Sequence, residues 1–461
     1  MKRRDLLHAL AATGVSAALP RAASAQTEGE ISIGAQATGP TIPPDYVGLS
    51  YEAAQLANPD FFAPANAALV TLFRELSPSG VLRIGGGSSE YTRYSDADPA
   101  GPPPFEIFGP DTSKTVKHGT VTSARALRNL RGFLDAAGWR CLYGLNFGQG
   151  SRENAAIEAA AVQRTLGDRL IALQIGNEPD SFRRRYRPAG WTPDDFIREW
   201  RDFHDAVAAA APGVKFAGPD ISNKLDYLTA FAAEAPRHPD VIMLSGHYYA
   251  MGPAGSPDAT LDQLMEPDPK TATMHLAGMD VVQGAVRTAG LPFRMTEGGS
   301  CWDGGKPGVS DTLASALWCA DAMLRFAQRG WIGVNWHGGG NGFYTPIAGA
   351  PSTGFTRRPQ YFGIQFAQLL TGGRFLPLTA SGLDPHVTAY ALQQDGRRRL
   401  AVINKAERSA RITLPGAVGA KAEMLTGPAL DSKEATSFRT VAVVPTRTIT
   451  VPPHTAMLFG L

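Results

Sequence analysis

Short apolar runs alternate with longer amphipathic stretches along residues 46–370, and this repeat constrains the fold more than any other feature of the chain. Eight apolar runs have the length and composition of buried strands. They are residues 47–51, 81–85, 140–147, 170–176, 215–219, 241–248, 293–296 and 332–336. Helical spacing of apolar residues follows each run. These helices are predicted at residues 65–76, 123–137, 153–166, 194–211, 225–234, 271–289, 312–328 and 359–370.

Eight strands that are each followed by a helix predict a (β/α)8 TIM barrel of the α/β class. An open doubly wound sheet is the structural alternative. Such a sheet commonly carries a Gly-rich phosphate loop after its first strand, whereas Ser50, Tyr51 and Glu52 stand at that position here. The closed barrel is therefore the favoured fold.

Beyond Gly373 the pattern changes to short strands separated by turn residues, which predicts a small β-sandwich. Its strands are expected at residues 375–379, 387–393, 400–404, 410–414, 448–451 and 456–459. A strand within residues 30–41 stands alone before the barrel, so we expect it to complete the sandwich. The predicted division is an export signal at 1–25, an N-terminal strand segment at 26–45, the barrel at 46–372 and the sandwich at 373–461.

The first 25 residues have the features of an export signal. Basic residues at positions 2–4 precede an apolar segment, 6–19, and small residues at 23–25 form a cleavage site. The paired Arg3 and Arg4 resemble a twin-arginine signal, which predicts a bacterial periplasmic or extracellular protein. An amphipathic N-terminal helix is the alternative. Because this segment holds four basic side chains and one acidic one, its removal lowers the net charge from +2 to −1.

This near-neutral charge gives no support for a nucleic-acid partner, and no stretch after the signal is apolar for long enough to span a membrane. Three cysteines are too few and too widely spaced for a disulfide framework or a zinc site. Cys141 and Cys319 are expected in the core, and Cys301 in a loop. We therefore expect an enzyme that needs no metal or cofactor and that can act as a monomer.

Active sites of such barrels lie at the C-terminal ends of the strands. Two carboxylates stand there on opposite sides of the ring, Glu178 after the fourth strand and Glu297 after the seventh. Hydrolysis of a glycosidic bond requires one protonated and one ionised carboxyl group flanking the sugar. A separation of about 5–5.5 Å would give retention of configuration, and about 6.5–9.5 Å would give inversion.

The motifs around these residues resemble those of a known family. Asn177-Glu178-Pro179 and Thr296-Glu297-Gly298 match the pattern of clan A retaining glycosidases, and the runs IGNEPDSF, MTEGGSCWDGG and SDTLASALW resemble glycoside hydrolase family 79. This family contains β-glucuronidases and heparanases. The resemblance covers most of the chain after the signal and implies Glu178 as acid/base and Glu297 as nucleophile.

The same resemblance implies the substrate-binding residues. Asn177 would bind the sugar 2-hydroxyl, and Tyr249 would donate a hydrogen bond to Glu297. The backbone amides of Gly304 and Gly305, together with the Tyr344 phenol, would bind the glucuronate carboxylate. A simple packing residue is the alternative for Tyr249, and a surface loop is the alternative for the glycine pair.

Glu52 is expected to accept hydrogen bonds from the outer hydroxyls of the sugar, and an ion pair with Arg83 is its alternative. Cys301 and Trp302 occupy a position where some relatives carry a tyrosine, so stacking could replace a hydrogen bond there. The basic residues that follow the acid/base loop could contact an acidic neighbouring sugar, although a solvated surface is the favoured interpretation. These are Arg183, Arg184, Arg185 and Arg187.

The resulting expectation is a retaining exo-β-glucuronidase that acts on a glycan or glucuronide containing glucuronic acid. An endo-acting, heparanase-like hydrolase of sulfated glycosaminoglycans is the first alternative, and the near-neutral charge favours the exo enzyme. A non-catalytic carbohydrate-binding barrel is the alternative from a different class. Both glutamates, the asparagine and the tyrosine stand in register, which argues against it.

Overall fold

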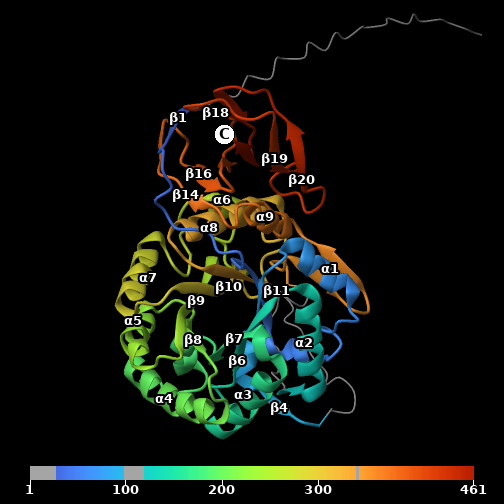
Figure 1. Ribbon diagram of the computed structural model, residues 1–461, viewed down its shortest axis with the longest axis vertical. Coiled ribbons are helices and arrows are strands. Elements are labelled where there is room, and N and C mark those ends of the chain that lie inside the picture. Colours follow the sequence, from blue (N-terminus) through green and yellow to red (C-terminus); the bar gives the residue numbers. More distant parts are fainter. Residues whose placement is uncertain (1–26, 98–118, 339–341) are drawn as a thin grey trace, which may run out of the picture.

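A computed structural model describes residues 27–97, 119–338 and 342–461. Eight parallel strands close into a barrel in the order β10-β11-β2-β3-β6-β7-β8-β9, which confirms the predicted fold class (Figure 1). These strands are β2 (Val47–Glu52), β3 (Val81–Gly85), β6 (Arg140–Leu145), β7 (Leu170–Ile175), β8 (Phe216–Ile221), β9 (Val241–Pro253), β10 (Phe293–Trp302) and β11 (Gly333–Gly338). The predicted export signal lies outside the described residues.

Helices cover the outside of the barrel, and eight of them coincide with the predicted amphipathic stretches to within a few residues (Figure 1). They are α1 (Ala67–Leu76), α2 (Ala124–Ala137), α3 (Arg152–Leu166), α4 (Pro193–Ala210), α5 (Leu225–Glu234), α7 (Leu276–Ala289), α8 (Leu313–Gln328) and α9 (Pro359–Gln368). A short helix, α6 (Leu261–Met265), was not predicted. Within the described residues, no helix is both long and apolar enough to cross a membrane.

Local signals in the sequence fix several helix ends. Thr192 begins α4 with a capping box, in which its side chain and that of Asp195 each accept from the other's backbone amide. Gly138 ends α2 in the left-handed conformation, with φ of 78°, which a residue with a Cβ atom adopts only at a cost.

Two further sheets form the C-terminal part of the chain (Figure 1). One has the order β15-β1-β18-β21, with strands β1 (Thr27–Ile33), β15 (Leu378–Ser381), β18 (Ala410–Thr413) and β21 (Thr448–Val451). The other has the order β14-β16-β17-β22-β19-β20, with strands β14 (Arg374–Phe375), β16 (Val387–Gln394), β17 (Arg397–Asn404), β19 (Lys421–Thr426), β20 (Ser437–Ala442) and β22 (Thr455–Gly460). The N-terminal strand β1 pairs with both β15 and β18, as expected.

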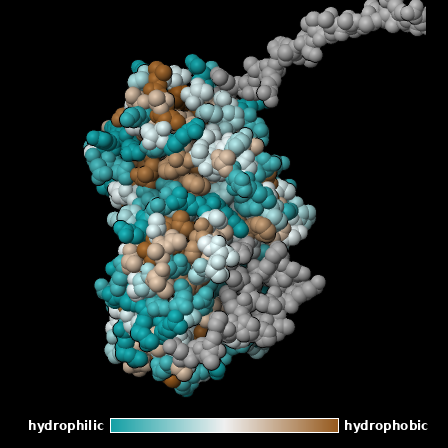
Figure 2. Space-filling view, turned by 90° about the vertical axis from the view of Figure 1, so that its right-hand side faces the viewer, coloured by the Kyte–Doolittle hydropathy of each residue, from teal (hydrophilic) through white to brown (hydrophobic). Residues whose placement is uncertain are grey.

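Alternation along β17 shows how the six-stranded sheet is buried on both faces. Leu400 and Val402 point into the core between the two C-terminal sheets, whereas Ala401 and Ile403 belong to the core shared with the barrel. Helices α8 and α9 lie between the barrel and this sheet (Figure 1). On the face shown in Figure 2, small groups of hydrophobic side chains are separated by hydrophilic ones.

Pairs of short strands lie outside these sheets. Parallel strands β4 (Thr92–Ser95) and β5 (Thr120–Ser123) pair with each other, and β12 (Ile347–Ala350) forms a hairpin with β13 (Gly354–Arg357). None of the four was predicted. Cys141, Cys301 and Cys319 are buried free thiols, but Cys301 lies inside β10 rather than in the expected loop, because this strand continues through Trp302.

Candidate active site

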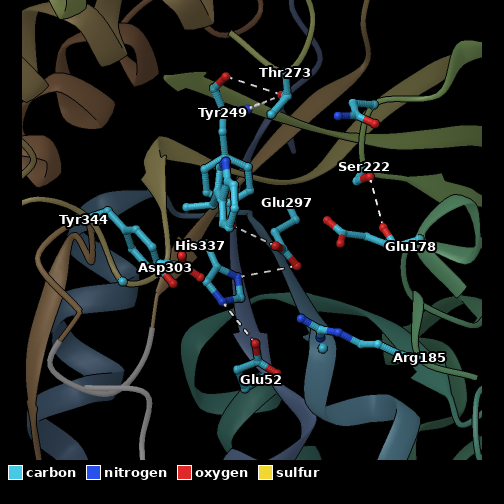
Figure 3. Close-up of a pocket in the computed structure, with 15 residues that line it drawn as sticks. Glu52, Glu178, Arg185, Ser222, Tyr249, Thr273, Glu297, Asp303, His337 and Tyr344 are labelled. Carbon is cyan, nitrogen blue, oxygen red and sulfur yellow. Dashed lines mark hydrogen bonds and ion pairs between the residues drawn. The ribbon is translucent and has the colours of Figure 1, made fainter. Parts of the chain in front are cut away.

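A cavity of about 300 Å³ opens where the barrel strands reach their carboxyl ends (Figure 3). Strand ends contribute Glu52 from β2, Glu178 from the loop after β7, Tyr249 from β9, Glu297 from β10 and His337 from β11. Loops add Arg185, Asp303, Gly304 and Tyr344. The cavity therefore contains most of the residues that the sequence singled out.

The two predicted carboxylates face each other across this cavity (Figure 3). One carboxylate oxygen of Glu178, one of Glu297 and a ring nitrogen of His247 all lie within 4.8 Å of one another. The side chain of Glu178 is 28% exposed and that of Glu297 is 9% exposed. Glu178 is thus the carboxylate with more access to solvent.

Backbone geometry after β7 directs Glu178 into the cavity. Glu178 adopts the left-handed conformation, with φ of 53° and ψ of 54°, which costs a non-glycine residue roughly 1–2 kcal/mol. Its amide donates to the carbonyl of Asp220 at 2.9 Å, and its carbonyl accepts from the amide of Ser181 at 2.8 Å. These bonds hold the strained residue in place.

The surroundings of Glu178 favour its protonated form. Burial raises its pKa above the ordinary value, and the nearby carboxylate of Glu297 raises it further. His247 Nδ1 lies 2.9 Å from Glu178 Oε1, and this contact opposes part of the rise. Glu178 therefore has the properties of a general acid.

Glu297 is held in the opposite state. Burial alone would raise its pKa, but the positive charges of His337, His247 and Arg83 lower the pKa of Glu297 to about 2. The Tyr249 hydroxyl donates to Oε1 at 2.8 Å, and Arg83 Nη1 donates to Oε2 at 2.8 Å. This carboxylate is consequently ionised and fixed in orientation. The predicted hydrogen bond from Tyr249 is present.

Arg83 organises the floor of the cavity, and its part in the site was not predicted. Its guanidinium is fully buried and binds Glu297, Asp220 and the Asn177 side chain, the last at 2.7 Å. Asp220, in β8, also accepts a hydrogen bond of 2.6 Å from the side-chain amide nitrogen of Gln174. The ion pairs of Arg83 are with Glu297 and Asp220, so these contacts do not form the alternative pair of Arg83 with Glu52. The sequence feature that could have indicated this role is the position of Arg83 inside an otherwise apolar strand.

His247 completes this network from β9. Its Nε2 atom lies 3.3 Å from a carboxylate oxygen of Asp220, and its Nδ1 atom faces Glu178. Burial lowers the pKa of His247, but the carboxylates of Glu297 and Asp220 outweigh burial and raise it to about 10. Glu178, His247 and Glu297 thus form a network in which the imidazole balances the charge of the neighbouring carboxylates.

A buried carboxylate behind the site positions Asn177. Glu90 lies in the 3-10 helix Gly87–Tyr91 and accepts hydrogen bonds from the backbone amides of Asn177, Phe147 and Gly148. Burial raises the pKa of Glu90 to about 7, although these amides oppose the rise. Sequence reasoning did not assign Glu90 to the site.

On the β2 side of the cavity, Glu52 accepts a hydrogen bond of 2.7 Å from the Ser88 amide, and its Oε1 lies 3.5 Å from His337 Nε2. His337 in turn contacts the Tyr344 ring edge to face, with a centroid distance of 5.5 Å. Glu52 and Tyr344 both line the cavity (Figure 3).

Both residues of the glycine pair have a positive φ. Gly304 and Gly305 have φ of 82° and 79°, in the region that favours glycine. Gly304 lines the cavity, whereas a Cβ atom on Gly305 would lie 2.6 Å from the Tyr344 amide nitrogen. Asp303 also lines this side, so an anionic substrate group would meet a carboxylate as well as donors there.

The arginines after Glu178 have different surroundings. Arg185 lines the cavity beside Glu178 (Figure 3), while Arg187 turns away and binds Glu199 through its Nε atom at 2.9 Å. Arg183 is exposed. Trp302 lines the cavity and is 41% exposed.

Comparisons with known proteins identify the class. No protein-family profile matches the chain. A curated β-glucuronidase from Aspergillus niger is 24% identical over 393 residues, covering 79% of this chain and 70% of that protein. A second β-glucuronidase, from Neurospora crassa, is 26% identical over 341 residues, covering 67% of this chain and 58% of that protein.

Solved structures show the same fold. A 4-O-α-L-rhamnosyl-β-D-glucuronidase from Fusarium oxysporum superposes with a TM-score of 0.74 at 17% identity, covering 94% of this chain and 100% of that one. A family 51 arabinofuranosidase from Xanthomonas axonopodis gives a TM-score of 0.63 at 16% identity, covering 94% and 99%. The chain is a glycoside hydrolase on a (β/α)8 barrel, and it resembles family 79 enzymes.

Proposed function

We propose that this chain is a retaining exo-β-glucuronidase of the family 79 type, which releases terminal β-linked glucuronic acid from a glycan or glucuronide. The observation that carries the proposal is the pair Glu178 and Glu297, whose pKa values are moved in opposite directions. A protonated acid beside an ionised carboxylate is the arrangement that glycosidic cleavage requires.

The separation of the pair supports a double displacement. One carboxylate oxygen of Glu178 lies within 4.8 Å of one of Glu297, a proximity compatible with the about 5–5.5 Å between the carboxyl groups of retaining enzymes. Glu297 attacks the anomeric carbon while Glu178 gives its proton to the leaving oxygen. Glu178 then removes a proton from a water molecule while the water oxygen attacks the anomeric carbon, which breaks the bond to Glu297 and releases the sugar.

The charged floor of the cavity supports both steps. Tyr249 and Arg83 keep the Glu297 carboxylate ionised and aimed before attack. Arg83 holds the side chain of Asn177 and Glu90 holds its backbone amide, which supports the proposal that Asn177 hydrogen-bonds the 2-hydroxyl of the sugar as positive charge develops at the ring.

The substrate class rests on three arguments. Both curated relatives are β-glucuronidases, and the cavity is lined by Gly304 and Tyr344, two of the three donors proposed for the glucuronate carboxylate. The described residues that line the cavity include one Lys or Arg side chain, Arg185. A cleft for a sulfated polysaccharide needs a strongly basic rim, so exo action is favoured.

Asp303 lies on the same side of the cavity as Tyr344, so a glucuronate carboxylate bound there would also meet a negative charge. The decisive test therefore compares a substrate that has this carboxylate with a matched one that lacks it. The purified enzyme should hydrolyse an aryl β-glucuronide much faster than the corresponding aryl β-glucoside. Equal rates would contradict the proposed carboxylate pocket. On a defined oligosaccharide, the first product released should be monomeric glucuronic acid alone. Longer first products would indicate endo action.

The mechanism is tested separately. The first anomer seen by NMR should be the β form, and Glu297→Gln should lose essentially all turnover. Azide should rescue Glu297→Ala to give the inverted glycosyl azide, and Glu178→Ala to give the retained one. Activity that survives in Glu297→Gln would show that the nucleophile is another residue.

A further inference from the structure

A second cluster of titratable side chains lies at the opposite end of the barrel from the cavity. His204 is in α4, and His238 and Asp240 precede β9. The Asp240 carbonyl accepts a hydrogen bond of 2.9 Å from the amide of Phe216, the first residue of β8. The cluster therefore sits at the amino ends of β8 and β9 and takes no part in the proposed reaction.

Three potential ligand atoms converge in this cluster. One ring nitrogen of His204, one of His238 and one carboxylate oxygen of Asp240 lie within 4.8 Å of one another. His204 Nε2 is 3.1 Å from both carboxylate oxygens of Asp240. Tetrahedral ligands around zinc are separated by about 3.3 Å when the bonds are about 2.0–2.1 Å long, so small side-chain shifts suffice.

A carboxylate outside the cluster also contacts one ring nitrogen of each histidine. His204 Nδ1 is 3.1 Å from Asp205 Oδ1, and His238 Nε2 is 2.8 Å from Glu234 Oε1. A ring nitrogen that donates its proton to such a carboxylate leaves the second nitrogen with a lone pair. In His204 the second nitrogen, Nε2, is the one that faces the Asp240 carboxylate.

We propose that His204, His238 and Asp240 bind a transition-metal dication, for which Zn²⁺ has the best-matched ligand preference. Two imidazoles and one carboxylate form an N₂O donor set that suits zinc and is poor for Mg²⁺ or Ca²⁺. Water completes the tetrahedron, because the His238 and Asp240 side chains are 14% and 26% exposed.

The neighbours leave this position open to a cation. Among the described residues, Asp240 contacts His204, whereas Arg201 and Arg237 form their ion pairs with Glu234. The His204 ring stacks on Trp200 at a centroid distance of 4.9 Å, which fixes its orientation before a metal arrives. The metal would join α4 to the segment that enters β9, and its contribution is to stability rather than to hydrolysis.

The test uses the full chain, stripped with EDTA and then titrated with Zn²⁺. Calorimetry should show one saturable site, and the thermal unfolding midpoint should rise with the Zn²⁺ concentration. Co²⁺ should give the visible bands of a tetrahedral site, whereas Mg²⁺ should have no effect. Asp240→Asn and His238→Gln should each weaken Zn²⁺ binding at least tenfold, with hydrolytic activity of the metal-free protein unchanged.

Two controls exclude other sites. Glu178→Gln should retain full affinity, which separates this cluster from the carboxylate pair of the cavity. His275→Gln removes an exposed histidine that also contacts an aspartate, at 3.1 Å, and should also leave binding unchanged. If no saturable binding is found, or if Asp240→Asn binds Zn²⁺ as tightly as the parent, the proposal fails.

Discussion

Replacement of Tyr249 by phenylalanine removes a single contact, the hydrogen bond of 2.8 Å from its hydroxyl to Glu297 Oε1. The ring is buried and keeps its packing, including its contact with Tyr344 at a centroid distance of 6.4 Å. A hydrogen bond to a charged group contributes about 1.5–3 kcal/mol. If this hydrogen bond stabilises the transition state by that amount, its loss should lower kcat/KM roughly 10- to 150-fold, because 1.36 kcal/mol corresponds to a factor of ten.

The pH dependence of the same variant gives a second, independent readout. The pKa of Glu297 is lowered to about 2 in the native protein, and the Tyr249 hydroxyl is one of the causes. Glu297 acts in its ionised form, so the acid limb of the rate profile should move to higher pH in Tyr249→Phe. Tyr248→Phe is the matched control, because that ring packs on Phe326 of α8, at 5.1 Å, instead of on the site. Equal losses in both variants, or an unmoved acid limb, would refute the reasoning.

Three other substitutions test the remaining contacts. His247→Gln removes a positive charge that lowers the pKa of both Glu178 and Glu297. Both the acid limb, set by Glu297, and the alkaline limb, set by Glu178, of the kcat/KM profile should therefore move to higher pH. An alkaline limb that stays in place would contradict this. Tyr344→Phe should lower the glucuronide rate about tenfold and leave the aryl glucoside rate unchanged, and equal losses would exclude a carboxylate contact. Lys405→Met breaks the buried pair with Asp321 and should reduce the free energy of unfolding in urea by about 3 kcal/mol. Since the pKa of Asp321 is lowered in the folded state, its stabilising effect is present at neutral pH and is lost as the pH falls, so the deficit should shrink in acid.

Most of the fold could be predicted because the barrel strands are buried on both faces and therefore appear as uninterrupted apolar runs. The prediction failed where burial is one-sided. Strands β19 and β20 carry polar residues along much of their length, and β20 is an edge strand, so neither stands out from the loops around it. Cys301 was expected in a loop, but β10 continues through Gly298 and Gly299, two residues that do not extend the apolar run before them.

The site residues that the sequence missed follow from a requirement of charge balance. Glu178, Glu297 and Asp220 meet at a barrel mouth that excludes much of the solvent, and buried carboxylates at this distance cannot all ionise without cations. Arg83 and His247 supply that charge from inside apolar strands, where a positively charged side chain is costly unless it is paired. A basic residue within a buried barrel strand is thus evidence for several acidic groups at the adjacent strand ends. The acidic residues of this chain were predicted from their positions at strand ends. The presence of these acids in turn requires a buried cation nearby, and that requirement would have assigned Arg83 to the site.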